Sequence, residues 1–368
     1  MRFPAPTESL KDTIAMAAAT RRAHLRDHLA RLGLPGALVY SRRRSAVTWL
    51  TGYAPGFISN SAALWMPTAA EPVLGVEFPF EVERAHHSGL HTVPMSSPLD
   101  LIPADVERIG LLAGDLVIDE RTPALLEGLR SRNIDPVDLV AWATETRELK
   151  TGPERELLTH AAHIGDLALR AAGDVAVPGI SDYEIAARVE AAARAAGALR
   201  CLCLVGIGDG AVITEATGAV VAPGQSVGLE VSLYAAGAFM HVNTTLPPAP
   251  SRPADHRAIA ACRAARTALI DALSPGNTVD AVVTAGDTIL AEHGLLACKE
   301  YDFGHGLGCD TPEHPRLLYG TGRTVTAGAV VAVHVAVRRP GGETAMIGGP
   351  VFITEDGARE LCPGAVWT

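Results

Sequence analysis

The 368-residue sequence has few aromatic side chains, few cysteines, no excess of positive charge and no long hydrophobic run. Its net charge of −10 argues against binding to nucleic acids or to anionic membranes. No apolar stretch approaches the roughly 20 residues of a membrane span, and residues 1–12 lack the hydrophobic segment of a signal peptide. Six cysteines in a chain of this length indicate a reduced protein rather than a disulfide framework. We therefore expect a cytoplasmic protein with no nucleic-acid or membrane partner.

The composition predicts a packed fold of more than one domain. Hydrophobic residues make up 48% and charged residues 20% of a chain that is too long for one ordinary core. A junction is expected at Thr146–Leu158, where Thr151 and Glu154 match a capping box at the start of a long helix. We predict a smaller N-terminal α/β domain at residues 1–145 and a second domain at residues 146–368.

The apolar periodicity and the turn residues give the expected elements of the first domain. These are a helix at Thr20–Leu32, strands at Ala37–Tyr40, Ala62–Met66, Val73–Val76, Gly110–Ala113 and Leu116–Ile118, and a helix at Pro123–Arg130.

The second domain alternates helical and strand patterns in a way that indicates an α+β fold. A second capping box, Ser181 with Glu184, begins a helix that runs to Gly197. The other expected elements are helices at Pro253–Leu273 and Thr278–Glu292 and strands at Leu199–Val205, Val330–Val337 and Pro350–Thr354. We expect a curved antiparallel sheet covered on one side by helices.

The stretch Val227–Thr245 reads as a β-hairpin, because apolar and polar residues alternate on both sides of an Ala-Ala-Gly centre. With Ala235 and Ala236 in the turn, Glu230 lies opposite His241, with Cβ atoms about 4.5–5.5 Å apart. The alternation separates a polar face from an apolar one: Glu230, Ser232, His241 and Asn243 against Val231, Leu233, Met240 and Val242. A plain surface hairpin with a polar outer side would show the same pattern.

Motifs spread over nearly the whole chain carry a family resemblance. They are WLTGY (Trp49–Tyr53), RELKTGPERELL (Arg147–Leu158), GISDYEIAARVEAAARAAGA (Gly179–Ala198), PGQSVGLE (Pro223–Glu230), GHGLG (Gly304–Gly308), EHP (Glu313–Pro315) and ITEDGARELCPG (Ile353–Gly364). Together they resemble the creatinase, aminopeptidase P and prolidase group. The resemblance implies a C-terminal pita-bread domain preceded by a smaller creatinase-type α/β domain.

In the peptidase members, the resemblance implies two Asp, one His and two Glu that hold two divalent ions. This sequence departs from that set at four positions. The first Asp position carries Glu230 and the second carries His241, whereas the His position is kept as His305. The first Glu position carries His334 and the last falls on Gly348. Because imidazole cannot bridge two ions as a carboxylate does, we do not expect the two-ion site to form.

The same departures predict a different centre. Three neutral imidazoles with one open direction are a standard way to hold one catalytic ion, which would polarise the substrate. We expect His241, His305 and His334 as ligands, with zinc or iron favoured over manganese. Glu230 would bind the ion, orient an imidazole or act as a general base, and Glu313 would carry protons. A site without any metal is the alternative.

The function expected from these residues is hydrolysis, or related chemistry, at a C–N bond of a small nitrogenous metabolite. Three alternatives stay open. Creatinase and ectoine-type hydrolases suggest metal-independent acid–base chemistry by His and Glu. A pocket that has lost its activity would make the chain a binding module, in which His334 is a core residue. A true Xaa-Pro peptidase is the third.

The resemblance also implies a homodimer in which the N-terminal domain of one chain closes over the pocket of its neighbour. Residues after Gly52, including Tyr53 and Phe57, would then line the partner's site, or they are simply core aromatics.

Overall fold

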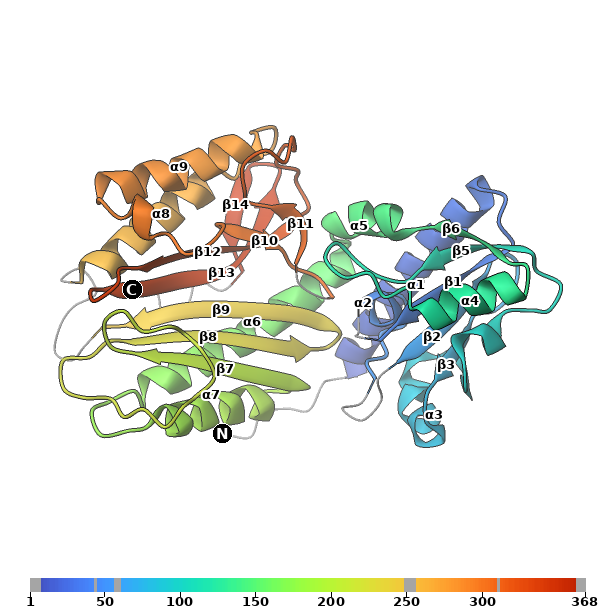
Figure 1. Ribbon diagram of the computed structural model, residues 1–368, viewed down its shortest axis with the longest axis horizontal. Helices are drawn as coiled ribbons and strands as arrows, with labels where there is room; N and C mark the ends of the chain where they lie inside the picture. Colours follow the sequence, from blue (N-terminus) through green and yellow to red (C-terminus); the bar gives the residue numbers. More distant parts are fainter. Residues whose placement is uncertain (1–7, 43–44, 56–60, 248–255, 310–311, 362–368) are drawn as a thin grey trace. The chain divides into compact units, whose positions relative to one another are not determined.

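The computed structural model describes residues 8–42, 45–55, 61–247, 256–309 and 312–361 (Figure 1). The chain divides into two compact units, one ending at Arg147 and the other starting at Glu148. None of the helices in the described ranges combines the length and the apolar character that a membrane span requires.

The N-terminal unit is a six-stranded sheet with helices around it. Its helices are α1 (Glu8–Arg31), α2 (Ser45–Thr51), α3 (Pro79–Ala85), α4 (Pro123–Ser131) and α5 (Val140–Glu148). Its strands are β1 (Gly36–Ser41), β2 (Ala62–Pro67), β3 (Val73–Val76), β4 (His91–Pro94), β5 (Arg108–Leu112) and β6 (Asp135–Asp138). The strand order is β4-β3-β2-β1-β5-β6, in which only β2 runs antiparallel to its neighbours.

Two features of this unit differ from the sequence expectation. The helix predicted at Thr20–Leu32 belongs to α1, which begins twelve residues earlier, at Glu8. The predicted strand at Leu116–Ile118 is wrong: the carboxylate of Asp115 accepts hydrogen bonds from the backbone N–H groups of Val117 and Ile118, both at 2.9 Å. An aspartate that bonds to its own backbone two and three residues on makes a turn, and this local bonding replaces strand pairing.

Tyr53 is a core residue of the N-terminal unit. Its side chain is 1% exposed and its hydroxyl group donates a hydrogen bond to Glu81. This burial agrees with the reading of Tyr53 as a core aromatic. Phe57 lies outside the described residues.

The C-terminal unit is an antiparallel sheet with helices packed on it (Figure 1). Its helices are α6 (Gly152–Gly173), α7 (Asp182–Ala195), α8 (Arg257–Ala272) and α9 (Val279–Glu292). Its strands are β7 (Arg200–Ile207), β8 (Val227–Ala235), β9 (Ala238–Leu246), β10 (Gly304–Gly306), β11 (Glu313–Arg316), β12 (Val330–Arg338), β13 (Thr344–Thr354) and β14 (Gly357–Glu360). The strand order is β11-β10-β12-β13-β9-β8-β7, and β14 pairs with β13.

Both predicted capping boxes are confirmed. The side chain of Thr151 accepts a hydrogen bond from the backbone of Glu154, and the Glu154 carboxylate accepts one from the backbone N–H of Thr151 at 2.8 Å. Ser181 and Glu184 do the same at the start of α7. These reciprocal bonds satisfy N–H groups that a helix start otherwise leaves without partners, so the two helices begin where the sequence indicates.

The turn of the central hairpin differs from the prediction by one residue. Ala235 pairs with Ala238, so the turn residues are Ala236 and Gly237, with φ values of +51° and +76°. Two positive φ values are the geometry of the tight hairpin turn that matches strand twist. The predicted pairing of Glu230 with His241 is therefore wrong.

In the observed register, Glu230 pairs with Asn243 and Ser232 pairs with His241. Moving the turn by one residue shifts the cross-strand register by two, and a shift of two leaves every side chain on its own face. The predicted division into a polar and an apolar face is confirmed.

The helices cover the apolar face of the sheet. On β9, Val242 lies against α6, because a Cβ on Gly165 would be 3.1 Å from its Cγ2 atom. The alternate valines of β12 belong to the core shared with α8 and α9; they are Val331, Val333, Val335 and Val337. Since successive strand residues point to opposite faces, His241 and His334 lie on the face away from these helices.

Candidate metal centre

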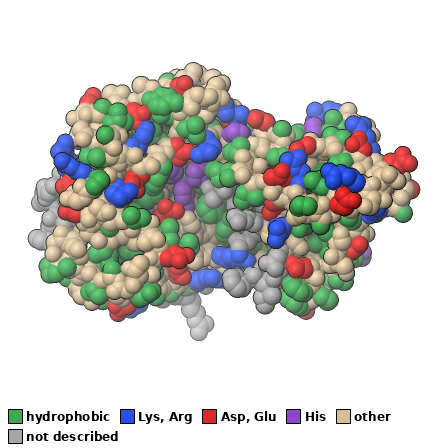
Figure 2. Space-filling view, in the orientation of Figure 1, with side chains coloured by type: hydrophobic (Ala, Val, Ile, Leu, Met, Phe, Trp, Pro, Cys, Tyr) green, Lys and Arg blue, Asp and Glu red, His purple; other side chains and the backbone are tan. Residues whose placement is uncertain are grey.

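Three strands that are distant in sequence bring three histidines together. His241 lies on β9, His305 on β10 and His334 on β12. The ring centroids are 5.0 Å apart for His241 and His305, 5.4 Å for His241 and His334, and 5.6 Å for His305 and His334. One ring nitrogen from each residue can be chosen so that all three lie within 4.8 Å of one another. In Figure 2, histidine side chains are visible in a recess of the C-terminal unit.

A glycine lies between the strands that carry two of these rings. On β13, Gly348 pairs with His334 on one side and with Asn243 on the other. A Cβ atom at Gly348 would overlap the Cβ of His334 and would lie 2.8 Å from Oδ1 of Asn243. The position at which the resemblance implies the last Glu is therefore in the centre of the site, and it has no room for a side chain.

The acidic side chain at the site is Glu230, which the sequence placed beside His241. Its Oε1 atom lies 3.9 Å from Nδ1 of His241, and Ser232 Oγ donates to the same oxygen at 3.5 Å. Burial acts to raise the pKa of Glu230, but the neighbouring imidazole of His241 and then Ser232 outweigh it, so this pKa lies below its ordinary value. Glu230 is an anion at neutral pH, and it faces Nδ1 of His241.

Two of the imidazoles are held in the neutral form. Burial lowers the pKa of His305 to about 4, and the charge of His241 acts in the same direction. Burial also lowers the pKa of His334 well below the ordinary histidine value, with His241 and His305 as further causes. A neutral imidazole keeps the lone pair that a metal ligand needs.

Two imidazole nitrogens in this cluster lack a hydrogen-bond partner within the described ranges. They are Nε2 of His241 and Nδ1 of His334, and both atoms are buried. Nδ1 of His305 lies 3.0 Å from the carbonyl oxygen of Gly306, an arrangement in which Nδ1–H donates and Nε2 keeps its lone pair. A buried polar atom without a partner costs about 1–3 kcal/mol. The donor set fits one transition-metal ion, and it does not fit a pair of ions bridged by carboxylates.

Glu313 has different partners from the other predicted residues. Its carboxylate forms an ion pair with Lys150, with Nζ and Oε2 2.6 Å apart and the two side chains 1% and 5% exposed. The backbone N–H of Cys309 donates to its Oε1 atom at 3.1 Å. These contacts tie β11 to the segment before α6 and to the loop after His305. A catalytic role for Glu313 stays a prediction.

Two further residues beside the cluster, Tyr301 and Met346, were not indicated by any sequence pattern. The ring of Tyr301 packs edge-on against that of His334, with centroids 5.2 Å apart. Its hydroxyl group lies 3.2 Å from Sδ of Met346, which is two residues before Gly348 on β13. Burial raises the pKa of Tyr301, and the negative charge of Glu230 acts in the same direction, so the hydroxyl stays protonated.

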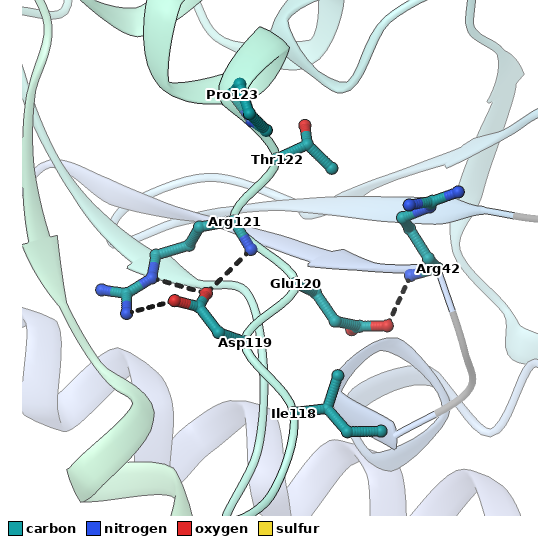
Figure 3. A pocket seen from close by; sticks show the side chains of 7 residues that line it. All are labelled: Arg42, Ile118, Asp119, Glu120, Arg121, Thr122 and Pro123. Atoms are coloured by element: carbon teal, nitrogen blue, oxygen red, sulfur yellow. Dashed lines mark hydrogen bonds and ion pairs between the residues drawn. The ribbon is translucent and has the colours of Figure 1, made fainter.

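A cavity lies in the N-terminal unit, and its lining contains no histidine (Figure 3). Its volume is about 490 Å³, and its lining residues are Arg42, Ile118, Asp119, Glu120, Arg121, Thr122 and Pro123. The guanidinium of Arg121 is bound by Asp119 at 2.7 Å and by Asp138 at 2.8 Å. Glu120 accepts the backbone N–H of Arg42 at 3.0 Å. Because the carboxylates of this cavity already have protein partners, we take the histidine cluster as the functional site.

An antiparallel sheet with helices on one face and a cluster of histidines on the other is the arrangement of a pita-bread domain. The model of metallopeptidase family M24 matches residues 156–356, more than half of the chain. The protein therefore belongs to metallopeptidase family M24, and the predicted superfamily and fold class are confirmed.

Solved structures of similar fold cover almost the whole chain. The prolidase from Pyrococcus horikoshii has a TM-score of 0.81 and 17% sequence identity, over 94% of this chain and 98% of that one. The dipeptidase PepE from Mycobacterium ulcerans has a TM-score of 0.76 and 22% identity, over 94% of this chain and 96% of that one. At these identities the likeness concerns the fold.

Two curated relatives have similar sequences. The probable dipeptidase PepE of Mycobacterium tuberculosis is 33% identical over 101 residues, and this match spans 27% of each chain. The uncharacterized peptidase YqhT of Bacillus subtilis is 25% identical over 92% of this chain and 96% of its own.

Proposed function

We propose that this protein is a hydrolase of a C–N bond in a small nitrogenous molecule, at a centre where one transition-metal ion is held by three histidines. The observation that carries this proposal is a pair of buried imidazole nitrogens that have no partner among the described residues, Nε2 of His241 and Nδ1 of His334, beside His305. Such atoms are costly unless something binds them. The relatives described as dipeptidases and prolidases support hydrolysis, since a peptide bond is a C–N bond.

Each residue of the centre has its own role in this proposal. His241, His305 and His334 would hold the ion, and zinc or iron suits three nitrogen donors better than manganese. The ion, when bound, supplies a Lewis acid that polarises the bond to be cleaved. Glu230 orients His241 through Nδ1, and its carboxylate, 24% exposed, can accept a proton from the attacking water.

Elemental analysis of full-length protein, purified without a histidine tag, tests the metal centre. We expect close to one zinc or iron per chain, as for other three-histidine sites. His241→Ala, His305→Ala and His334→Ala should each lose the ion, whereas His163→Ala, at an exposed position on α6, should keep it. Wild-type protein without a bound ion, or a full complement of metal in His334→Ala, contradicts the proposal.

A second candidate is metal-independent hydrolysis by histidine and glutamate, which the Glu230–His241 pair favours. It predicts that hydrolysis of a small amide survives prolonged chelation, whereas the metal proposal predicts its loss and its return when zinc or iron is added. A third candidate, suggested by the relatives, is cleavage of Xaa-Pro dipeptides with manganese or cobalt. No release of proline under those conditions excludes it.

A further inference from the structure

One more buried polar atom without a partner lies beside the three histidines. Asn243 on β9 is 0% exposed, and its Oδ1 atom has no hydrogen-bond partner within the described ranges. Its backbone pairs with Glu230 on β8 and with Gly348 on β13, the residue that pairs with His334. Asn243 thus lies in the cross-strand row of residues that runs from Glu230 to His334.

The orientation of the carboxamide follows from its other contact. Nδ2 of Asn243 donates to Sδ of Met346 at 3.5 Å. A thioether sulfur accepts a hydrogen bond but has none to give, so turning the amide over would leave Oδ1 facing an atom that cannot donate. Oδ1 therefore points the other way, over Gly348, where a Cβ atom would lie only 2.8 Å from it. Because residue 348 is a glycine, no side chain from that position lies against this buried oxygen.

We propose that Asn243 is a substrate-binding residue whose Oδ1 accepts a hydrogen bond from an N–H group of the substrate. The inference rests on the proposed function, because it takes the histidine cluster as the substrate site. It limits the substrate to molecules with an N–H donor, such as primary or secondary amides and amidines. An ion is the weaker candidate for this oxygen, because zinc or iron held by three imidazoles has no need of a carboxamide, whose oxygen suits harder cations.

A buried acceptor that lacks a partner among the described residues also gives selectivity. A site built to bond a substrate N–H rejects the analogue without it, since its own polar group is then buried without a partner. In the free protein the same atom is a cost, so removing it should stabilise the fold. A group that lowers stability but improves binding is the signature of a functional side chain.

The test compares acetamide with acetone, which has the same shape but no N–H, by ligand-observed NMR on the full-length protein. Wild type should bind acetamide about tenfold more tightly than acetone, the worth of one hydrogen bond. Asn243→Leu, of similar size, should abolish this difference, keep the metal content of wild type and raise Tm.

Thr245→Val is the matched control. Thr245 is two residues along the same strand, and its hydroxyl group is already bonded to the backbone carbonyl oxygen and N–H of Met346, at 3.2 and 2.8 Å. This variant should lower Tm and leave the preference for acetamide unchanged.

Three results would overturn the inference: equal or absent binding of the two probes by wild type, a preference that persists in Asn243→Leu, or loss of the ion in that variant. The comparison of the two probes on wild type needs no substitution, so it tests the inference even if Asn243→Leu does not fold. If the protein holds no ion and hydrolyses no amide, the proposed function fails. A preference for acetamide that depends on Asn243 would still support the present inference.

Discussion

The glycine at position 348 is required by the close approach of residue 334. They are directly paired across β13 and β12, at a separation that leaves no room for a second Cβ atom. The atoms in the way are the Cα and Cβ atoms of residue 334, which every residue except glycine has. A chain with a carboxylate at 348 would therefore have to move one of the two strands.

Gly348→Ala should destabilise the protein by about 1–3 kcal/mol, as expected for an overpacked position. The new Cβ atom would overlap the Cα and Cβ atoms of His334. The imidazole of His334 would then shift, and the protein should also bind less metal. Thermal unfolding and elemental analysis measure both effects. Gly173→Ala is the control, because a Cβ there meets nothing within 4 Å; it should not lower stability and should leave the metal content unchanged. Equal behaviour of the two variants would show that position 348 is not crowded.

Among the single elements, helix α7 is fixed at its start by more than its capping box. The carboxylate of Asp182, its first residue, accepts hydrogen bonds from the backbone N–H groups of Thr217 and Gly218, both at 2.8 Å, and from the hydroxyl of Thr217 at 3.1 Å. The capping box could be read from sequence because its partners are three residues apart. The link to residues 217 and 218 could not, since those residues come after the next strand.

Asp182 should contribute stability that depends on pH. Burial acts to raise the pKa of Asp182, but its hydrogen bonds outweigh burial and hold the pKa below the ordinary value. A depressed pKa in the folded state means that the contribution is present above the unfolded value of about 3.9 and is lost as the pH falls through the folded value.

Asp182→Ala should therefore cost about 1–3 kcal/mol at pH 7, and less at pH 3. Chemical denaturation at the two pH values measures the difference. Asp174→Ala, at an exposed position after α6, should change little at either pH. A cost for Asp182→Ala that does not depend on pH would mean that its carboxylate is not the stabilising group.

On the scale of the whole molecule, every residue assigned to the centre belongs to the unit that starts at Glu148. This unit has its own core, built from α8, α9 and the strands they cover. A fragment of residues 148–368 should therefore fold and bind the same number of ions per chain as the full protein, measured by circular dichroism and elemental analysis. The same fragment with His334→Ala should fold without the ion. A fragment that folds but binds no metal would show that residues 1–147 are needed at the centre.

The sequence alone determined the features that depend on near neighbours along the chain. Alternation with a period of two assigned both faces of the hairpin. This assignment is correct although the turn was predicted one residue too early, because the register differs by an even number of residues. Caps with a spacing of three residues fixed the starts of α6 and α7. The motifs, each of them local, indicated the family.

Only the tertiary structure decided which groups meet. The partner of Glu313 is Lys150, and Tyr301 lies on His334, although nothing in the local pattern of either pair indicates the other. The same holds for Oδ1 of Asn243, which has no partner in the part of the chain that the structure describes, because such a lack can be seen only when the neighbours in space are known. Contacts between distant strands depend on sheet order and register, and these are set by the packing of the whole unit.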